Sequence, residues 1–583
     1  MVKVRPEMRQ LRGVAAAPGY AMGAARLVGR QEAEIDPRSI SAEQAEAELE
    51  RLENGQRGAQ TELEQLEITA RETVGEEEAD IVASHLLMLD DPDLLDPIRE
   101  KIGRDLLNAE RAVAEVSDEL IVTLQALESS YIKQRADDLR DVRDRLLRHL
   151  RGDGGDPLQG LTEPVVLIAR DLAPTDTLRL RKDLVKGFAT DEGGSASHTA
   201  IVARSLDIPA VVGLNSATGE IRDGDYVIVD GVNGLVIIDP DPPVRDEYRQ
   251  REAAYRAERE ALASFRGEPS VSADGTHLEL MANIGSVQEA RTAAEQSADG
   301  IGLYRTEFLY MGRARLPTEE EQLEAYLAII RTIGPDKPLI IRSLDIGGDK
   351  ELPAFGLERE SNPFLGYRAI RLCLDRQELF KTQLRAIARS SAYGCVKLMY
   401  PMISTLTELR QANALLEEAR RELSAEGIPY NPQMEVGVMI EVPSAVLVAD
   451  KLAKEADFFS IGTNDLVQYA LAVDRMNGKI SHLYQPFDPA VLRLISMTVD
   501  SARREGKWVG MCGEMAGQPK ALPLLLGMGL TELSMNPSSV LRCRMLLSQL
   551  SMRDAEQLAE QALKSESAQE VEQLLDNFLQ AVK

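Results

Sequence analysis

A glycine pair leads to a single histidine in the stretch Asp191-Glu192-Gly193-Gly194-Ser195-Ala196-Ser197-His198-Thr199-Ala200-Ile201-Val202-Ala203-Arg204-Ser205. The apolar residues after His198 have helical spacing, which predicts that a helix begins there. The first turn of a helix offers unpaired backbone N–H groups and the positive end of the helix dipole, and both favour a phosphoryl group. A loop histidine preceded by a capping serine is the alternative interpretation, and this stretch alone does not separate the two.

Short apolar runs flank the histidine stretch, with helical segments between them, so residues 154–240 predict an α/β domain. Short strands are also expected within 12–28. We therefore assign 13–40 and 154–240 to one domain, in which the first segment pairs with the later strands, and 1–12 to a loose basic tail. The later strands are expected at Val165–Ala169, Gly187–Thr190, Ala210–Gly213 and Tyr226–Asp230.

Residues 41–153 separate the two parts of this domain and have the pattern of a helical bundle. A capping box begins the segment, with Ser41 as the N-cap and Gln44 three residues later. Leucine and valine recur at spacings of three and four residues, which predicts amphipathic helices packed in an antiparallel bundle. The acidic run Glu76-Glu77-Glu78-Ala79-Asp80 is interpreted as a solvated helix face or, alternatively, as a docking surface for a basic partner.

A proline-rich stop, Asp239-Pro240-Asp241-Pro242-Pro243, ends the α/β pattern, and a charged helical stretch follows. We interpret 241–269 as a linker helix. From 270 to 583 the chain alternates short strands with longer helical segments, which predicts a C-terminal (β/α)8 barrel, or TIM barrel. Its expected strands are Leu278–Ala282, Gly300–Tyr304, Leu339–Arg342, Val396–Met399, Val436–Ile440, Phe458–Ile461, Trp508–Met511 and Glu532–Met535.

Polar residues follow directly where the expected barrel strands end, and the C-terminal strand ends form the active site of such a barrel. Arginine forks match carboxylate and phosphate groups, two acidic side chains can hold Mg²⁺, and a cysteine can move a proton to or from carbon. Singly, each residue is more often an ion pair, a cap or packing. Together they predict a site for a polyanion and a metal. The residues are Arg305, Arg342, Arg475, Glu441, Asp465, Asn464 and Cys512.

The composition indicates a globular protein of several domains, with 583 residues of which 44% are hydrophobic and 28% charged. A net charge of −28 argues against a nucleic-acid or anionic-membrane partner. The scattered cysteines Cys373, Cys395, Cys512 and Cys543 fit a reducing compartment better than a disulfide framework or a zinc site. There is no signal-peptide pattern and no apolar run of about 18 residues. We therefore expect a cytoplasmic protein.

Several segments resemble those of one family. Gly193–Arg204 resembles the phosphohistidine signature of the phosphoenolpyruvate-utilising enzymes. The barrel resembles that of Enzyme I of the bacterial sugar phosphotransferase system, and the resemblance runs in the family's domain order from about Gly13 to the C-terminus. The barrel segments that carry it are Gly302–Leu309, Asp345–Pro353, Asn362–Gly366, Phe458–Leu466 and Gly510–Glu514.

The resemblance implies a reaction and a set of roles. His198 would take the phosphoryl group from phosphoenolpyruvate on Nε2 and pass it to a histidine of the carrier HPr, releasing pyruvate, as the first step of the sugar phosphotransferase system. Cys512 matches the proton donor that converts the enolate to pyruvate, and Thr177 falls where the family has a threonine that hydrogen-bonds the active histidine. The positions matched to substrate binding are Arg305, Arg342, Asn464, Asp465 and Arg475, and those matched to Mg²⁺ are Glu441 and Asp465.

The resemblance also implies partners and motion. The helical bundle matches the HPr-binding subdomain, with His85 in its expected interface, and the barrel matches the phosphoenolpyruvate-binding and dimerisation domain of a homodimer. Nucleophile and substrate site fall on different domains, so one must swing to the other, with the hinge expected near 239–266. Ser195-Ala196 stand where many members have Arg-Thr, which could alter the charge around His198.

Three other functions share part of this pattern. A dikinase or synthase that makes phosphoenolpyruvate from pyruvate and ATP would need a nucleotide-binding domain, and this chain has neither the length nor a P-loop for one. A nitrogen-regulatory branch of the family would be expected to carry an extra N-terminal sensor domain. A non-catalytic scaffold would not need the intact set of His198, Glu441, Asp465 and Cys512.

Overall fold

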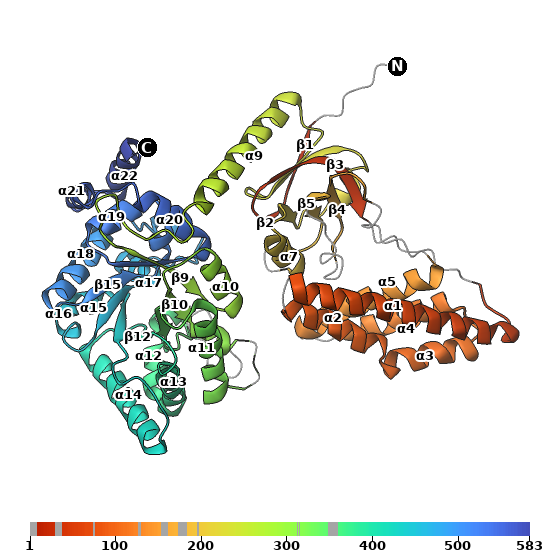
Figure 1. Ribbon diagram of the computed structural model, residues 1–583, viewed down its shortest axis with the longest axis horizontal. Helices are drawn as coiled ribbons and strands as arrows, with labels where there is room; N and C mark the ends of the chain where they lie inside the picture. Colours follow the sequence, from red (N-terminus) through yellow and green to blue (C-terminus); the bar gives the residue numbers. More distant parts are fainter. Residues whose placement is uncertain are drawn as a thin grey trace. The chain divides into compact units, whose positions relative to one another are not determined.

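The structure is a computed structural model that describes residues 8–28, 38–73, 76–125, 130–152, 161–172, 183–194, 197–311, 313, 315–347 and 360–582. The chain divides into two compact units, residues 1–258 and 259–583, and the boundary lies inside helix α9 (Pro242–Ala263). A mixed sheet, a helical bundle and a strand barrel are visible as separate assemblies in Figure 1. This architecture confirms the predicted multidomain α/β fold.

The first unit contains an eight-stranded sheet in the order β1-β8-β7-β3-β4-β5-β6-β2. Its central strands β3 to β6 are parallel, and the other strands pair antiparallel with their neighbours. The early strands β2 and β3 pair with the late strands β6 and β7, as the sequence predicted. The strands are β1 (Arg9–Arg12), β2 (Val14–Ala17), β3 (Tyr20–Val28), β4 (Val165–Ala169), β5 (Val185–Thr190), β6 (Ala210–Val212), β7 (Tyr226–Asp230) and β8 (Leu235–Ile238).

The expectation of a loose tail over 1–12 is wrong for its last four residues. Arg9–Arg12 form the edge strand β1, which pairs antiparallel with β8 from Arg9↔Ile238 to Arg12↔Leu235. An edge strand needs only one partner, and its charged side chains can remain in solvent. Leu11 packs against the sheet core, which gives this short strand its apolar anchor.

Two apolar cores flank the sheet and hold the helices that follow β5. Ala200 and Ala203 place α7 (His198–Leu206) on one core, and Ala217 places α8 (Ala217–Glu220) on the other. The start of α9 is anchored by Tyr248, whose hydroxyl donates to the buried Asp230 carboxylate at 3.0 Å. Burial, followed by the Asp230 charge, raises the pKa of Tyr248 to about 12, so this donor stays protonated.

The helical segment forms a bundle in which the helices lie side by side (Figure 1). Leucine, valine and alanine side chains from all of its helices make one continuous core. The Ser41 and Gln44 capping box is formed at the entrance, where the Ser41 amide donates to Gln44 Oε1 at 2.9 Å. The helices are η1 (Ala42–Gln44), α1 (Ala45–Thr73), α2 (Glu76–Leu89), α3 (Pro92–Gly103), α4 (Ala109–Gln125) and α5 (Ser130–Arg151).

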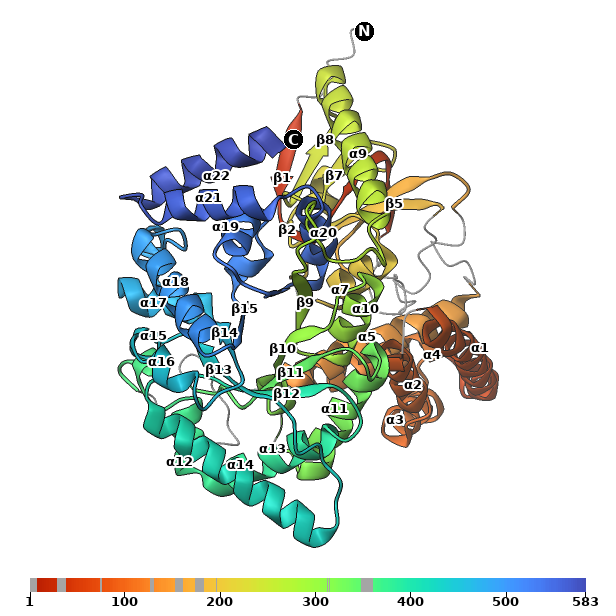
Figure 2. The same cartoon turned by 60° about the vertical axis from the view of Figure 1, so that its left-hand side comes forward.

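The second unit is a closed barrel of eight parallel strands surrounded by helices (Figure 2). Each of the eight expected strands is present, so the predicted TIM barrel is confirmed. The strands are β9 (Glu279–Ile284), β10 (Ile301–Arg305), β11 (Leu339–Arg342), β12 (Val396–Tyr400), β13 (Val436–Ile440), β14 (Phe458–Ile461), β15 (Trp508–Met511) and β16 (Glu532–Met535).

The barrel helices bury one apolar face each against these strands. None of the helices in the described part of the chain is both long and apolar enough to cross a membrane. The helices are α10 (Val287–Glu295), η2 (Thr306–Leu309), α11 (Glu319–Ile333), η4 (Pro363–Leu365), α12 (Ile370–Asp375), α13 (Gln377–Ser390), α14 (Leu406–Glu426), α15 (Pro443–Leu447), α16 (Ala449–Leu452), α17 (Thr463–Leu471), η5 (Ser481–Leu483), α18 (Pro489–Arg504), η6 (Glu514–Gly517), α19 (Leu522–Gly527), η7 (Pro537–Ser539), α20 (Val540–Leu547), α21 (Met552–Ala562) and α22 (Ala568–Val582).

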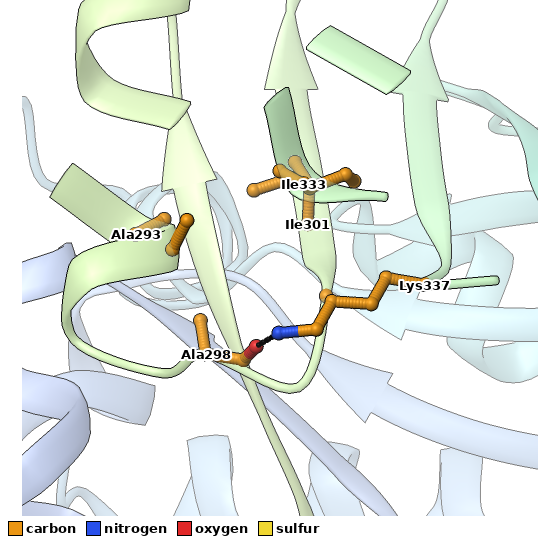
Figure 3. A pocket seen from close by; sticks show the side chains of 7 residues that line it. Ala293, Ala298, Ile301, Ile333 and Lys337 are labelled. Carbon is orange, nitrogen blue, oxygen red and sulfur yellow. Dashed lines mark hydrogen bonds between the residues drawn. The ribbon is translucent and has the colours of Figure 1, made fainter. Parts of the chain in front are cut away.

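A small hollow near the N-terminal end of β10 is closed by a lysine. Ala293, Ile301 and Ile333 line it, and the Lys337 ammonium crosses its mouth to donate to the Ala298 carbonyl at 2.6 Å (Figure 3). The lining is apolar, and the lysine side chain covers it along its methylene groups. This end of the barrel therefore has the packed character expected of its stability face.

The barrel core should be sensitive to truncation at Leu398, which is fully buried on β12. We expect Leu398→Ala to lower the free energy of unfolding by about 2–5 kcal/mol, because the substitution leaves a cavity. Leu447→Ala, at a side chain that is 68% exposed, should change it by less than about 0.5 kcal/mol. Urea unfolding followed by the fluorescence of Trp508, the single tryptophan of the chain, measures both variants. Equal effects of the two substitutions would contradict this view of the core.

Candidate active site at the barrel strand ends

Two predicted arginines end neighbouring strands of the barrel. Arg305 on β10 and Arg342 on β11 are register partners. The buried Arg342 donates to Glu307 Oε1 at 2.6 Å and lies 2.9 Å from Asp345 Oδ2. Burial opposes the charged form of Arg342, but Glu307, Asp345 and then Glu441 raise its pKa above the ordinary value. The guanidinium is thus held in place with its charge intact.

A third guanidinium, Arg368, was missed by the sequence analysis. Its Nη2 lies 2.9 Å from Asp345 Oδ1 and 3.6 Å from Asp465 Oδ2, so it joins the loop after β11 to the helix after β14. Arg368 follows no strand end, which is why a search of strand ends passed over it. Its proximity to the quoted segment Asn362–Gly366 is the one signal in the sequence that pointed to it.

The two predicted metal ligands are buried and electrostatically coupled. Glu441 follows β13, and one of its oxygens accepts the Met402 amide at 2.6 Å. Burial raises the pKa of Glu441, and the charges of Asp465 and Asp345 raise it further, while Arg342 and Arg368 oppose the shift. The carboxyl groups of Glu441, Asp465 and Asp345 therefore interact unfavourably at these strand ends.

The donor set fits Mg²⁺ as a pair of ligands. Among the described residues there is no cluster of three or more His, Cys, Asp or Glu side chains arranged for a metal. Asp465 Oδ1 is buried and has no hydrogen-bond partner in the part of the chain that the structure describes. Mg²⁺ is commonly bound by one or two carboxylates, with water and substrate oxygens completing its shell. Glu441 and Asp465 supply such a pair.

Asn464 and Arg475 come from the segment that follows β14. The Asn464 amide donates to Glu514 Oε1 at 3.2 Å and accepts the Glu514 backbone N–H at 2.9 Å, which fixes the orientation of its side chain. The Asn464 carbonyl accepts the Tyr484 hydroxyl at 3.2 Å. Burial raises the pKa of Tyr484, and the charge of Arg475 opposes the shift. The Arg475 backbone N–H donates to Gln468 Oε1 at 3.1 Å, which ties this segment to α17.

Cys512 directly follows β15 and is 4% exposed. It belongs to the apolar cluster inside the barrel, together with Met439 and Phe458. Asn283 Nδ2 donates to the Cys512 carbonyl at 2.9 Å and fixes the backbone there. Burial raises the pKa of the Cys512 thiol to about 12, with the Ser460 hydroxyl opposing the shift. The group is a protonated thiol at neutral pH.

The histidine stretch occupies the other unit of the chain, at the start of α7. His198 is the first helical residue, and Ser197 is the N-cap, whose Oγ accepts the Ala200 amide at 3.3 Å. Gly193 has a φ of +103°, in the left-handed region, and so lets the loop turn into the helix. The predicted helix start is present, and it places the backbone of His198 at the positive end of the helix dipole.

Some sequence-based assignments fall outside the described residues. These are Thr177 and Ser195-Ala196. One assignment is wrong: His85 was placed in a docking interface, but its side chain is fully buried in the bundle. Its ring nitrogens lie 3.4 Å from Asp138 and 3.5 Å from Asp141 on α5. Because His85 lies on the apolar side of α2, it packs inward and does not belong to a contact surface.

Comparison with known proteins gives consecutive matches along the chain. The N-terminal domain of the phosphoenolpyruvate-utilising enzymes matches residues 12–135, their mobile domain matches 161–234, and their phosphoenolpyruvate-binding domain matches 259–552. A phosphoenolpyruvate-protein phosphotransferase of Geobacillus stearothermophilus is 50% identical over 563 residues, which cover 97% of each chain. That of Bacillus subtilis (strain 168) is 48% identical over 564 residues, which cover 97% of this chain and 98% of the relative.

The chain belongs to the phosphoenolpyruvate-protein phosphotransferase family. Within this family, the strand ends described above lie in the matched phosphoenolpyruvate-binding domain, and His198 lies in the matched mobile domain. An NMR structure of Enzyme I (nEIt) covers 42% of this chain and 99% of its own, with 40% identity and a TM-score of 0.37.

The high pKa of Cys512 should make it resistant to alkylation in the native protein. At pH 8 a thiol with a pKa of about 12 is ionised in roughly one molecule in 10⁴, and only the thiolate reacts. Cys395 is exposed and should be labelled first by iodoacetamide. Peptide mass spectrometry over a time course measures both sites. Labelling of Cys512 as fast as that of Cys395 would contradict the buried thiol.

Proposed function

We propose that this chain transfers the phosphoryl group of phosphoenolpyruvate to His198 and then to a histidine of the carrier HPr, releasing pyruvate. This is the first step of the sugar phosphotransferase system. The observation that carries the proposal is the presence of guanidinium, carboxylate and thiol groups together at one edge of the barrel, in a chain of this family. Three steps follow from that chemistry.

The first step is recognition of a small polyanion. Phosphoenolpyruvate has a carboxylate beside a phosphate, and guanidinium forks match both groups. Arg305, Arg342 and Arg475 are proposed to bind the substrate, with Asn464 donating to a phosphate oxygen and Asp465 supporting the site. Arg368 holds Asp345 and Asp465 in place, so it acts as a positioning residue in this scheme.

The second step is phosphoryl transfer, which needs charge neutralisation. Glu441 and Asp465 are proposed to hold Mg²⁺, and the bound ion would supply electrostatic stabilisation to the transferring phosphoryl group. The arginines neutralise the remaining oxygens. His198 is proposed as the nucleophile, because a neutral imidazole of moderate pKa forms a labile P–N bond. Thr177 would orient its ring through a hydrogen bond.

The third step returns a proton to carbon. Departure of the phosphoryl group leaves the enolate of pyruvate, and its methylene carbon needs a proton. Cys512 is proposed to donate it, because its thiol is protonated and lies at the same strand ends as the arginines. The Cys512 S–H bond then breaks as the new C–H bond forms.

The helical bundle is proposed as the HPr-docking part. Asp80 is exposed on α2, and Leu87 on the same helix is 76% exposed, so α2 offers an acidic group and an apolar anchor. This combination suits a carrier with a basic face. The net charge of −28 disfavours nucleic acid or an anionic membrane as an alternative partner.

Assembly and location are also proposals. We propose a cytoplasmic homodimer that associates through the barrel. Met476 is 66% exposed and Leu483 is 50% exposed in the segment after α17, and apolar side chains of this size are natural contacts for a second copy. The linker around α9 is the proposed hinge for the movement of the histidine domain.

The nucleophile assignment predicts a specific covalent label. Incubation with phosphoenolpyruvate labelled in its phosphate and with Mg²⁺ should place acid-labile phosphate on His198, and adding HPr should remove it. His198→Ala should take up no label, because no other group at the start of α7 forms a phosphoramidate. ATP in place of phosphoenolpyruvate is the control for a dikinase and should label the protein far more slowly. A wild-type protein that stays unlabelled by phosphoenolpyruvate would refute the proposal.

The proton-donor assignment predicts that Cys512→Ala slows pyruvate formation but leaves the affinity for phosphoenolpyruvate almost unchanged. Pyruvate formation should slow by roughly 10²–10⁴-fold, the usual contribution of a general acid. The affinity for phosphoenolpyruvate should change by less than about threefold, because an uncharged thiol contributes little to binding a polyanion. Coupled pyruvate assays and equilibrium binding measure the two quantities. Equal losses in both would make Cys512 a structural residue.

A further inference from the structure

A buried carboxyl group inside the barrel has no role in the steps above. Glu532 begins β16 and has no exposed surface. Gly302 on β10 and Gly510 on β15 leave the space that its side chain fills, because a Cβ at either position would overlap the Glu532 carboxylate. Strands β10 and β15 therefore have glycine, with no side chain, at the positions that border the Glu532 carboxyl group.

The location of this acid relates it to Cys512. Gly510 is the register partner of Glu532 on one side and of Ser460 on the other, so the three residues lie at one level across neighbouring strands. Cys512 lies two residues beyond Gly510 on the same inward face, about 6.5 Å further along the strand. The Ser460 hydroxyl is near enough to the Cys512 thiol to oppose the rise of its pKa. Glu532 and Ser460 therefore lie at one level of the barrel interior, and Cys512 lies at the next inward-facing level along β15.

Among the described residues, no other group competes for the hydrogen bonds of Glu532 and Ser460. Neither Glu532 oxygen, nor the Ser460 hydroxyl, has a hydrogen-bond partner of normal geometry among the described residues. Burial raises the pKa of Glu532 well above its ordinary value, and the charge of Glu279 raises it further, while Lys397 and the Met511 amide oppose the shift. Burial and the neighbouring carboxylate thus both favour the protonated form of Glu532.

The N-terminal mouth of the barrel offers a route for replacement of that proton. Glu279 on β9 is the register partner of Glu532 and is only partly buried. Burial raises its pKa, with Lys397 and His277 opposing and Asp299 and Glu435 reinforcing the shift. Lys397 lies 2.5 Å from Glu435 and 4.5 Å from the centre of the Trp508 ring, so its ammonium is already paired with a carboxylate.

We propose that Glu532 restores the proton that Cys512 gives to the enolate, by way of the Ser460 hydroxyl, and is itself reprotonated from the N-terminal mouth through Glu279. The inference rests on the proposed function. After the C–H bond forms, Cys512 is a thiolate; Ser460 passes its proton to the sulfur and takes the proton of Glu532. The Glu532 carboxylate then regains a proton from solvent. Glu532 touches no substrate and acts through Cys512.

The test compares the rate of the first turnover with the rates of later turnovers in the Glu532→Gln variant. The amide fills the same space and is uncharged like the protonated acid, but it cannot give up a proton as an acid. Because Cys512 is already protonated at rest, the first phosphorylation of the protein and the first pyruvate should appear at the wild-type rate in rapid-quench experiments. Later turnovers with HPr should slow at least tenfold, with a larger solvent deuterium isotope effect, because the thiolate waits for a proton.

Other variants provide the controls. Ser460→Ala interrupts the same route and should also slow later turnovers selectively, which keeps the test valid if Glu532→Gln folds poorly. Glu532→Asp retains a carboxylic acid and should recover part of the lost rate. Glu417→Gln removes an exposed carboxylate of α14 that pairs with Arg420 outside the barrel interior, and it should behave like the wild type.

The possible outcomes are distinct. Wild-type protein that is not phosphorylated would overturn the proposed function and this inference together. If the wild type turns over normally, steady-state rates of Glu532→Gln and Ser460→Ala equal to it would overturn the proton route alone. Equal slowing of the first and later turnovers, or a lower midpoint of thermal unfolding with no change in isotope effect, would make Glu532 structural and would also overturn it.

Discussion

The candidate site depends on a cluster of buried charges at the C-terminal ends of the barrel strands. Arg342 and Arg368 are bonded to Glu307, Asp345 and Asp465, and Glu441 adds a further carboxylate nearby. Two guanidiniums thus face four carboxyl groups, an excess that burial makes costly. The strain is visible in the raised pKa of Glu441. A divalent cation would relieve it, which is the physical reason for the metal site proposed at Glu441 and Asp465.

The interior of the barrel below this cluster is layered. Phe458 stacks on Trp508 at 4.4 Å near the N-terminal ends of the strands, and Cys512 lies near their C-terminal ends. Glu532 and Ser460 lie between these layers, in a level where glycines replace side chains. A TIM barrel usually fills such levels with branched apolar residues. Burying the Glu532 carboxyl group at this level costs desolvation free energy. A chemical role therefore explains its presence better than packing does.

Much of this fold was predictable from sequence because barrel strands are short apolar runs with polar residues directly after them. The β11, β13, β14, β15 and β16 bounds agree with the sequence prediction to the residue. Strand ends could likewise indicate Arg342, Glu441 and Asp465. They could not indicate Arg368, which reaches the site from a loop and helix start, or the inward orientation of His85. The pairing of Arg9–Arg12 also depends on a distant partner, β8, that no local pattern reveals.

The division of the chain into two units has a chemical consequence. The described surroundings of the His198 backbone contribute a helix N-terminus, the capping Ser197 and Thr199, whose hydroxyl donates to the Leu172 carbonyl at 3.1 Å. None of these groups is a guanidinium or a thiol. The barrel has those groups, in a core of its own. In the proposed cycle, a histidine that serves both a donor and an acceptor gains from this arrangement, because neither site has to be rebuilt after the phosphoryl group has moved. The proposed cycle then has a cost, because transfer between groups on separate units makes its rate depend on the movement of a whole folded domain as well as on the charges at the barrel edge.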